Sequence, residues 1–134
     1  MKTLDSAVSP RIDSVMPGFG VRDMNAAIDF YTTRLGFQVV FKNGAVFAIV
    51  SRNGIEISLG LDRAGAGKGA CYLKVKGVDA LHDDALHDEF VAKGVAMTHS
   101  LKTESYHMRE FMITDPDGNT LNFGEPVEKA GGVN

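Results

Sequence analysis

The chain carries its strongest fold signal at residues 108–125, Met108-Arg109-Glu110-Phe111-Met112-Ile113-Thr114-Asp115-Pro116-Asp117-Gly118-Asn119-Thr120-Leu121-Asn122-Phe123-Gly124-Glu125. Pro116 fixes φ at the second position of a tight turn, the Asp115 side chain can bond back to the backbone, and Gly118 tolerates a positive φ. Apolar and β-branched residues on both sides of this turn predict two strands, so the stretch is a β-hairpin. The side chain three residues beyond Asn119, on the second strand, is Asn122.

Residues 15–36 predict a strand followed by an amphipathic helix. The strand covers residues 15–21, and Pro17 indicates its start or a sheet edge because proline cannot donate to a ladder. Asp23 is a good N-cap, and Gly36 stands where a C-cap glycine belongs. Between them, apolar residues at helical spacing predict one buried face, formed by Met24, Ile28, Tyr31 and Leu35.

Three strands then follow on two Asn-Gly turns, at residues 37–42, 45–51 and 55–59. Asn-Gly between β-forming residues is the strongest short hairpin signal, and we take each pair as a two-residue loop. In that register one face is wholly apolar, and we expect the helix to cover it: Val39, Phe41, Val46, Ala48, Val50, Ile55, Ile57 and Leu59. The other face is mixed, as in a ligand cavity, and carries Gln38, Val40, Phe47, Ile49, Ser51, Glu56 and Ser58.

The glycine-rich residues 61–69 are predicted to form a flexible linker, after which the pattern restarts. A strand at 70–76, a helix at about 81–93 and a strand at about 95–99 lead to the closing hairpin. We therefore predict two βαβββ modules joined by the linker, an internal repeat with little identity left in sequence. The expected layout is an arm at 1–12, one domain at 13–126 with modules at about 13–60 and 70–126, and a flexible tail at 127–134.

A short repeat lies in the second predicted helix, where Ala80-Leu81-His82-Asp83 recurs as Ala85-Leu86-His87-Asp88. Five residues turn about 500° around a helix, so the two histidines cannot share one face. Metal-binding histidines on a helix need a spacing of three or four residues. We interpret the repeat as a tandem duplication and not as a metal site.

The bulk properties predict an ordinary small globular protein of 134 residues with 44% hydrophobic residues. A net charge of −3 argues against nucleic acid as a partner, and no apolar run is long enough to span a membrane. The first residues lack the apolar core of a signal peptide, so we expect a cytoplasmic location. Cys71 is the single cysteine, which excludes an intrachain disulfide and a cysteine metal cluster.

Three pieces in order resemble the vicinal oxygen chelate superfamily of glyoxalases, extradiol dioxygenases, fosfomycin-resistance enzymes and bleomycin-resistance proteins. They are Val21-Arg22-Asp23-Met24 with Phe30-Tyr31 and Leu35-Gly36-Phe37, then Tyr72-Leu73-Lys74-Val75 with Val78-Asp79-Ala80-Leu81, then Arg109-Glu110-Phe111 through Asp115-Pro116-Asp117-Gly118-Asn119 to Phe123-Gly124-Glu125. The resemblance covers roughly residues 15–126. It implies an α+β fold in which two βαβββ modules form a cupped eight-stranded mixed sheet, with helices on the outer face and the ligand site in the cup.

Enzymes of this superfamily hold a divalent metal with His and Glu side chains on the cup floor. The matching positions here are Met16, a residue near Ala70, Asn122 and Glu56. A thioether, a methyl group and a lone amide are poor ligands for hard divalent ions, so three of the four positions are lost. The resemblance is therefore to the bleomycin-resistance branch, which implies a homodimer without metal or cofactor that sequesters an antibiotic-like or other polar aromatic ligand.

Candidate ligand-binding residues on this reading are Phe47, Glu56, Ser58, Tyr72, Tyr106, Arg109, Phe111 and Asn122. Glu56 stands out because a carboxylate on the mixed strand face should be paired or lie in a wet cavity. Two enzyme hypotheses stay open beside binding. One is a metal-dependent glyoxalase- or dioxygenase-type enzyme that uses His107 or Glu110 with Glu56. The other is a cofactor-free enzyme with a buried Glu56 as general base.

Overall fold

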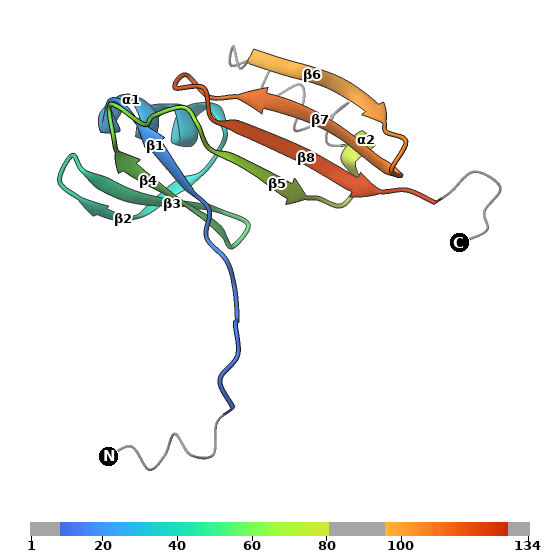
Figure 1. The fold of residues 1–134 in the computed structure, drawn as a ribbon, viewed down its shortest axis with the longest axis horizontal. Helices are drawn as coiled ribbons and strands as arrows, with labels where there is room; N and C mark the ends of the chain where they lie inside the picture. The colour runs from blue at the N-terminus through green and yellow to red at the C-terminus, as the bar shows by residue number, and fades with distance from the viewer. Residues whose placement is uncertain (1–8, 81–95, 129–134) are drawn as a thin grey trace.

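A computed structural model describes residues 9–80 and 96–128 of the chain (Figure 1). The elements of the first half are β1 (Gly18–Val21), α1 (Met24–Asp29), the π-helical η2 (Phe30–Arg34), β2 (Gln38–Asn43), β3 (Phe47–Arg52) and β4 (Ile55–Leu61). Those of the second half are β5 (Ala70–Lys74), α2 (Val78–Ala80), β6 (Ala96–Thr103), β7 (Met108–Thr114) and β8 (Thr120–Pro126). No helix in these two ranges is long and apolar enough to cross a membrane.

The strands form two four-stranded mixed sheets with the same internal order, β1-β4-β3-β2 (sheet A) and β5-β8-β7-β6 (sheet B). In each sheet the first strand pairs in parallel with the last strand of its module, and the other pairs are antiparallel. This confirms the predicted α+β class and the eight strands in two repeated units. The long second helix and the duplicated segment are predicted at residues that lie almost wholly outside the described ranges.

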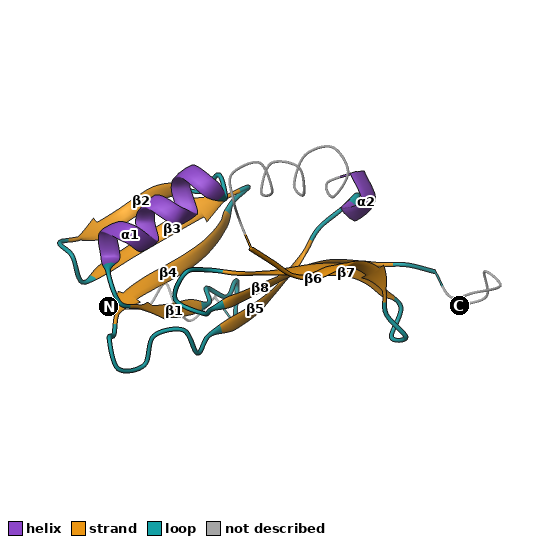
Figure 2. Ribbon diagram, turned by 90° about the horizontal axis from the view of Figure 1, so that it is seen from above, coloured by secondary structure: helices purple, strands orange, loops and turns teal. Residues whose placement is uncertain are grey.

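The first helix forms where the sequence predicts it, and it covers one face of sheet A (Figure 2). The Asp23 carboxylate accepts a hydrogen bond from the backbone N–H of Ala26 at 3.0 Å, as an N-cap residue should. The last turn widens so that the Leu35 N–H donates to the Phe30 carbonyl, and Gly36 then ends the helix at φ 76°. Tyr31 and Leu35 are fully buried, which confirms the predicted face.

The second hairpin has the predicted register, whereas the first does not. Ile49 lies opposite Ser58, and Ser51 lies opposite Glu56. In the first hairpin Asn43 pairs with Phe47, so the connection has three residues, and a bulge follows between Val39 and Phe41. The prediction of a two-residue loop at Asn43-Gly44 is therefore wrong.

This register change moves Phe41 to the face of Phe47, and the two ring centroids lie 6.1 Å apart. Phe41 is 50% exposed and does not lie under the helix. Of the strand residues predicted to face the helix, Ala48, Val50, Ile57 and Leu59 are fully buried, whereas Val39, Phe41, Val46 and Ile55 are exposed. The helix therefore covers β3 and β4 but leaves apolar side chains of β2 open to solvent.

The turn between β7 and β8 joins the two halves of the chain. The Asp115 carboxylate accepts hydrogen bonds from the backbone N–H groups of Asp117, Gly118 and Asn119, each at 2.9 Å. Its other oxygen accepts from the Tyr31 hydroxyl of η2 at 2.8 Å and from the Asn119 amide at 3.0 Å. Asp115 is 4% exposed, so this is a buried and fully bonded carboxylate that ties the closing hairpin to the first helix.

Asn119 extends the same connection to β1 and to the linker. Its amide donates to the Gly20 carbonyl at 3.0 Å and its carbonyl accepts from the Gly69 N–H at 2.8 Å. The Gly67 N–H also donates to the Gly20 carbonyl, and a Cβ on Gly67 would lie 1.9 Å from the Asp117 carbonyl oxygen. Residues of the predicted linker 61–69 are thus hydrogen-bonded to both modules, through Gly67 and Gly69.

Candidate functional site

The strands of sheet B have one face in the core and one open face. Phe111 and Phe123 pair across β7 and β8 on the core side, with centroids 5.3 Å apart in a stacked arrangement. Residues of the opposite parity therefore share the other face. The strand register places Tyr72 of β5 beside Asn122 of β8, and Glu110 of β7 beside Gly124 of β8.

Three side chains on this open face donate to one carboxylate, and we call the four residues the Glu110 cluster: Tyr72, Tyr106, Glu110 and Asn122. The hydroxyls of Tyr72 and Tyr106 each donate to Glu110 at 2.6 Å, one to each carboxylate oxygen. The Asn122 amide donates to the oxygen that Tyr106 also bonds, at 3.3 Å. Glu110 is 7% exposed, so the cluster holds a buried acid with three donors aimed at it.

Tyr106 reaches this position from the loop between β6 and β7. The Glu104 N–H donates to the Met108 carbonyl, and the His107 N–H donates to the Glu104 carbonyl, which closes a tight turn with His107 at φ 65°. Tyr106 thus lies four residues before its acceptor Glu110 and remains 57% exposed. It forms the outer wall of the cluster.

The cluster is charged at neutral pH. Burial raises the pKa of Glu110, but the hydrogen bonds from Tyr106, Tyr72 and Asn122 together lower it by more, so the pKa lies below the ordinary carboxyl value. The bond to Glu110, and to a lesser extent desolvation, raises the pKa of Tyr106 to about 12. Desolvation, followed by the bond to Glu110, also raises the pKa of Tyr72. Glu110 is therefore an anion and both phenols keep their protons.

A cavity of about 180 Å³ opens beside the cluster, lined by His99, Glu104, Tyr106, Glu110, Phe111, Met112 and Asn122. The side-chain amide oxygen of Asn122, a residue that lines this cavity, is buried, and it has no hydrogen-bond partner among the described residues. Most buried polar atoms in proteins are bonded, so an acceptor of this kind calls for an explanation.

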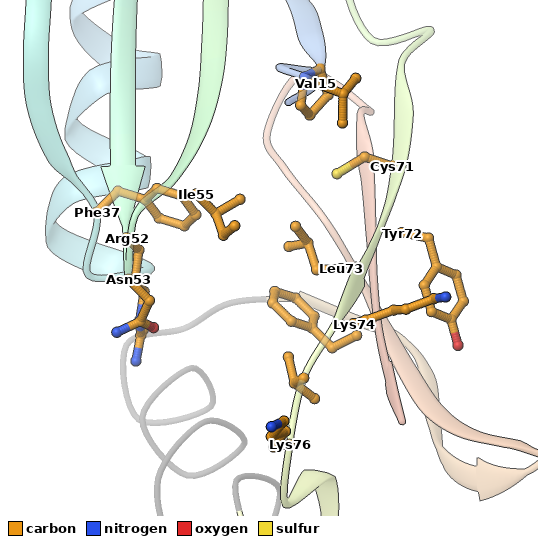
Figure 3. Close-up of a pocket in the computed structure, with 13 residues that line it drawn as sticks. Val15, Phe37, Arg52, Asn53, Ile55, Cys71, Tyr72, Leu73, Lys74 and Lys76 are labelled. Carbon is orange, nitrogen blue, oxygen red and sulfur yellow. The ribbon is translucent and has the colours of Figure 1, made fainter. Parts of the chain in front are cut away.

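A larger cavity of about 800 Å³ lies on the other side of β5, between the N-terminal arm, the β3–β4 turn and the strand (Figure 3). Cys71 and Leu73 point toward Phe37 and Ile55 across this space, whereas Tyr72 points away from it (Figure 3). Its wall is mostly apolar. The two cavities are therefore on opposite faces of sheet B.

The structure brings together only some of the predicted site residues. Tyr72, Tyr106 and Asn122 meet at Glu110, whereas Phe47, Glu56 and Ser58 lie on the separate sheet A. Glu56 is exposed in the single chain, so the burial expected of it as a general base is not found there, and its place in a ligand site stays a prediction.

Two other predicted residues lie away from the open face. Arg109 points to the α2 end of sheet B, where it forms an ion pair with Asp79 and donates to the Thr103 hydroxyl at 3.2 Å. Phe111 is fully buried against Phe123. Neither side chain is placed to join the Glu110 cluster.

The side chains at this site do not fit a divalent metal. The neighbour of Asn122 on β5 is Tyr72, a phenol whose hydroxyl already donates to Glu110. Residues 9–80 and 96–128 contain no group of three or more His, Cys, Asp and Glu arranged to hold a metal ion. The amide of Asn122 is a weak ligand without carboxylate or imidazole company.

Gly124 has no side chain, and this leaves space for the Tyr72 ring. A side chain at position 124 therefore tests the hydrogen bond between Tyr72 and Glu110. A Cβ at position 124 would lie 1.9 Å from the Tyr72 hydroxyl oxygen. We expect Gly124→Ala to push the hydroxyl off Glu110, so that one tyrosine ionises at lower pH in an alkaline ultraviolet titration. Gly60→Ala on β4, where a Cβ meets nothing within 4 Å, is the matched control. If both variants and the parent gave the same titration curve, the hydrogen bond from Tyr72 to Glu110 would be contradicted.

Comparison with known proteins places these features in context. The family model described as Glyoxalase/Bleomycin resistance protein/Dioxygenase superfamily matches residues 11–123. Bleomycin resistance proteins of Geobacillus stearothermophilus and Staphylococcus aureus are 26% identical over 135 residues, covering 84% of this chain and 96% of theirs.

Solved structures agree with this result. A bleomycin-binding protein from bleomycin-producing Streptomyces verticillus, complexed with copper(II)-bleomycin, has a TM-score of 0.71 and 26% identity, covering 86% of this chain and 97% of that chain. A bleomycin resistance determinant encoded on the transposon Tn5 has the same fold, with a TM-score of 0.73 and 19% identity over 86% of this chain and 98% of that chain.

Proposed function

Because the chain belongs to the glyoxalase/bleomycin resistance protein/dioxygenase superfamily, we propose that it is a metal-free protein that binds and sequesters an antibiotic-like small molecule. The Glu110 cluster carries this proposal, since it offers an acid and two aromatic rings on an open strand face beside a cavity. Similarity to bleomycin resistance proteins over most of the chain supports the same class of ligand.

Neither enzyme hypothesis gains comparable support. A general base at position 56 would benefit from burial, and Glu56 is exposed. A metal-dependent reaction would need a ligand set, and Glu110 has both carboxylate oxygens occupied by phenol donors. Binding needs only shape, stacking and charge, which the cluster supplies.

We further propose that the protein works as a homodimer, with a ligand site shared between Phe47, Glu56 and Ser58 of one copy and the Glu110 cluster of the other. The arm at residues 9–17 extends away from the body of the chain (Figure 1). Its residues Ile12 and Val15 are 95% and 85% exposed. Exposed aliphatic side chains on an extended arm favour burial against a second copy.

Calorimetric titration with metal-free bleomycin and with copper(II)-bleomycin tests the binding proposal, and elemental analysis of the purified protein tests its metal-free part. We expect saturable binding and a metal content far below one ion per chain. Tyr106→Ala removes an exposed ring and one donor to Glu110, and should weaken binding by about tenfold. Val46→Ala, which trims a similarly exposed residue on the β2–β3 loop, should leave binding unchanged.

Two results would count against this function. Absence of binding heat with both forms of bleomycin would reject that antibiotic as the ligand class. One tightly held metal ion per chain after dialysis would reject a metal-free protein and would direct attention back to an enzyme.

A further inference from the structure

The cavity of about 800 Å³ beside β5 is not part of the Glu110 site, because it lies on the opposite face of sheet B. Its walls come from the arm, the β3–β4 hairpin and β5. Cys71 and Leu73 of β5 face Phe37 and Ile55 across the space (Figure 3). Cavities of about 300–1,000 Å³ bind drug-sized molecules in proteins. The space is therefore large enough to hold a ligand of its own.

Apolar side chains line this cavity and remain open to it. Leu73 points into the space yet is only half-buried, and Ile55 and Val15 are 49% and 85% exposed. Burial raises the pKa of the Cys71 thiol to about 11, which indicates weakly polar surroundings. Water in such a space finds few polar partners, so an apolar occupant is favoured over solvent.

The charged side chains that line the cavity are all basic within the described part of the chain: Arg52, Lys74 and Lys76. Over the whole chain 17 acidic residues outnumber 14 lysines and arginines, so this basic lining is a local feature. Lys74 points away from the space, alongside Tyr72, which leaves Arg52 and Lys76 to act on an occupant (Figure 3). The sign of these two charges favours an anionic group.

The basic groups lie at one end of the apolar space. Arg52 is the last residue of β3 and Lys76 follows the end of β5, whereas Val15 of the arm lies at the other end (Figure 3). A hydrogen bond of 2.6 Å from the Arg52 guanidinium to the Leu35 carbonyl holds this positive charge in place. The cavity thus combines an apolar body with one positive end.

From this separation of apolar and basic surfaces we propose that the cavity is a second ligand site, which binds an amphiphile made of an aliphatic body and a carboxylate. The aliphatic body packs between Leu73 and Ile55, and the carboxylate lies near Arg52 and Lys76. This site is separate from the proposed function, because Tyr72 and the Glu110 carboxylate that it bonds lie on the other face of sheet B.

The single cysteine of the chain reports on occupancy, since Cys71 points into the cavity. N-ethylmaleimide is small and uncharged, and intact mass spectrometry of the full chain follows its reaction with the thiol. We expect decanoate to slow this reaction in a saturable way. Decylammonium has the same tail with the opposite charge, and acetate has the charge without the tail. Neither should slow the reaction at the same concentration, and equal protection by decanoate and decylammonium would overturn the proposal.

Other occupants of the space give different results in the same assay. If decanoate had no effect on the rate, the cavity would be closed to it or filled by another part of the chain, and the proposal would be overturned. A reaction in buffer alone that becomes faster on dilution would identify a second copy of the chain as the occupant, which would also overturn it.

Substitutions locate the two ends of the ligand. Ile55→Asp places a negative charge beside the aliphatic body and should raise the decanoate concentration for half-protection about tenfold. Val46→Asp adds the same charge at a similarly exposed residue outside the cavity and should leave this concentration unchanged. Lys76→Gln should raise it about threefold, whereas Lys42→Gln, an exposed change on β2, should not. Undiminished protection in both Ile55→Asp and Lys76→Gln would overturn the proposal.

Tyr106→Ala separates this site from the Glu110 cluster, because Tyr106 lies on the other side of sheet B. Protection of Cys71 by decanoate should be the same in this variant as in the parent. Loss of protection would mean that decanoate acts from the open face of sheet B, and would overturn the second site. Intact protection in a protein that does not bind bleomycin would support the second site and reject the antibiotic.

Discussion

Replacing Asp115 by alanine is expected to lower the free energy of unfolding by about 3–5 kcal/mol. The substitution removes the acceptor of five hydrogen bonds, three from backbone N–H groups of its own turn and two from the side chains of Tyr31 and Asn119. Tyr31 is fully buried, so its hydroxyl would be left without a partner and away from water. A buried donor in that state costs about 1–3 kcal/mol by itself.

Urea unfolding followed by circular dichroism measures this effect. Asp62→Ala is the matched control, because Asp62 is an exposed turn aspartate that accepts one backbone bond, from Gly65 at 2.9 Å. We expect the control to lose about 1 kcal/mol or less. If the Asp115 and Asp62 variants unfolded at the same urea concentration, the buried Asp115 would contribute no more to stability than the exposed Asp62.

The second large effect concerns the N-terminal arm. Ile12→Asp with Val15→Asp is expected to weaken dimer formation at least a hundredfold, since burying two aliphatic side chains contributes about 3–6 kcal/mol and a buried charge adds a penalty. Within one chain both residues are exposed, so the variant should keep its fold. Sedimentation velocity over a range of concentrations gives the dimer affinity, and far-ultraviolet circular dichroism checks the fold.

The arm prediction has its own control. Val46→Asp places the same charge at another exposed aliphatic residue, on the β2–β3 loop, and should leave the dimer intact. Bleomycin binding should fall with the dimer if the site is shared between copies. A parent protein that is monomeric at all concentrations, or a variant that dimerises like the parent, would refute the proposed role of the arm.

Local signals in the sequence predicted most of the fold. The Asp23 cap, the buried helix face and the turn at residues 115–119 are all set by neighbours within a few residues, and all are confirmed. The predicted register of the first hairpin was wrong because Asn43-Gly44 fits both a two-residue loop and the start of a longer loop. The Asn43 carbonyl accepts from the Val46 N–H, and that choice shifts every partner on β2.

The candidate site was harder to predict because its parts come from four separate segments, β5, the β6–β7 loop, β7 and β8. Tyr72 lies on β5, Tyr106 on the β6–β7 loop and Asn122 on β8. Only the folded sheet brings their side chains to the carboxylate of Glu110 on β7. A signal for Glu110 was nevertheless present, since it alternates with the apolar Phe111 and Ile113. A carboxylate in that position must lie on the open face of its strand.

The contact between Tyr31 and Asp115 has a consequence for how the protein folds. The two residues are 84 positions apart, so the first helix lacks the acceptor for its buried hydroxyl until nearly the whole chain has been synthesised. Contacts of such long range slow folding, because the intervening chain must first be ordered. They also link the two modules into one cooperative unit. The first module on a ribosome is therefore expected to stay incomplete until the closing hairpin emerges, and the mature protein should melt in a single transition.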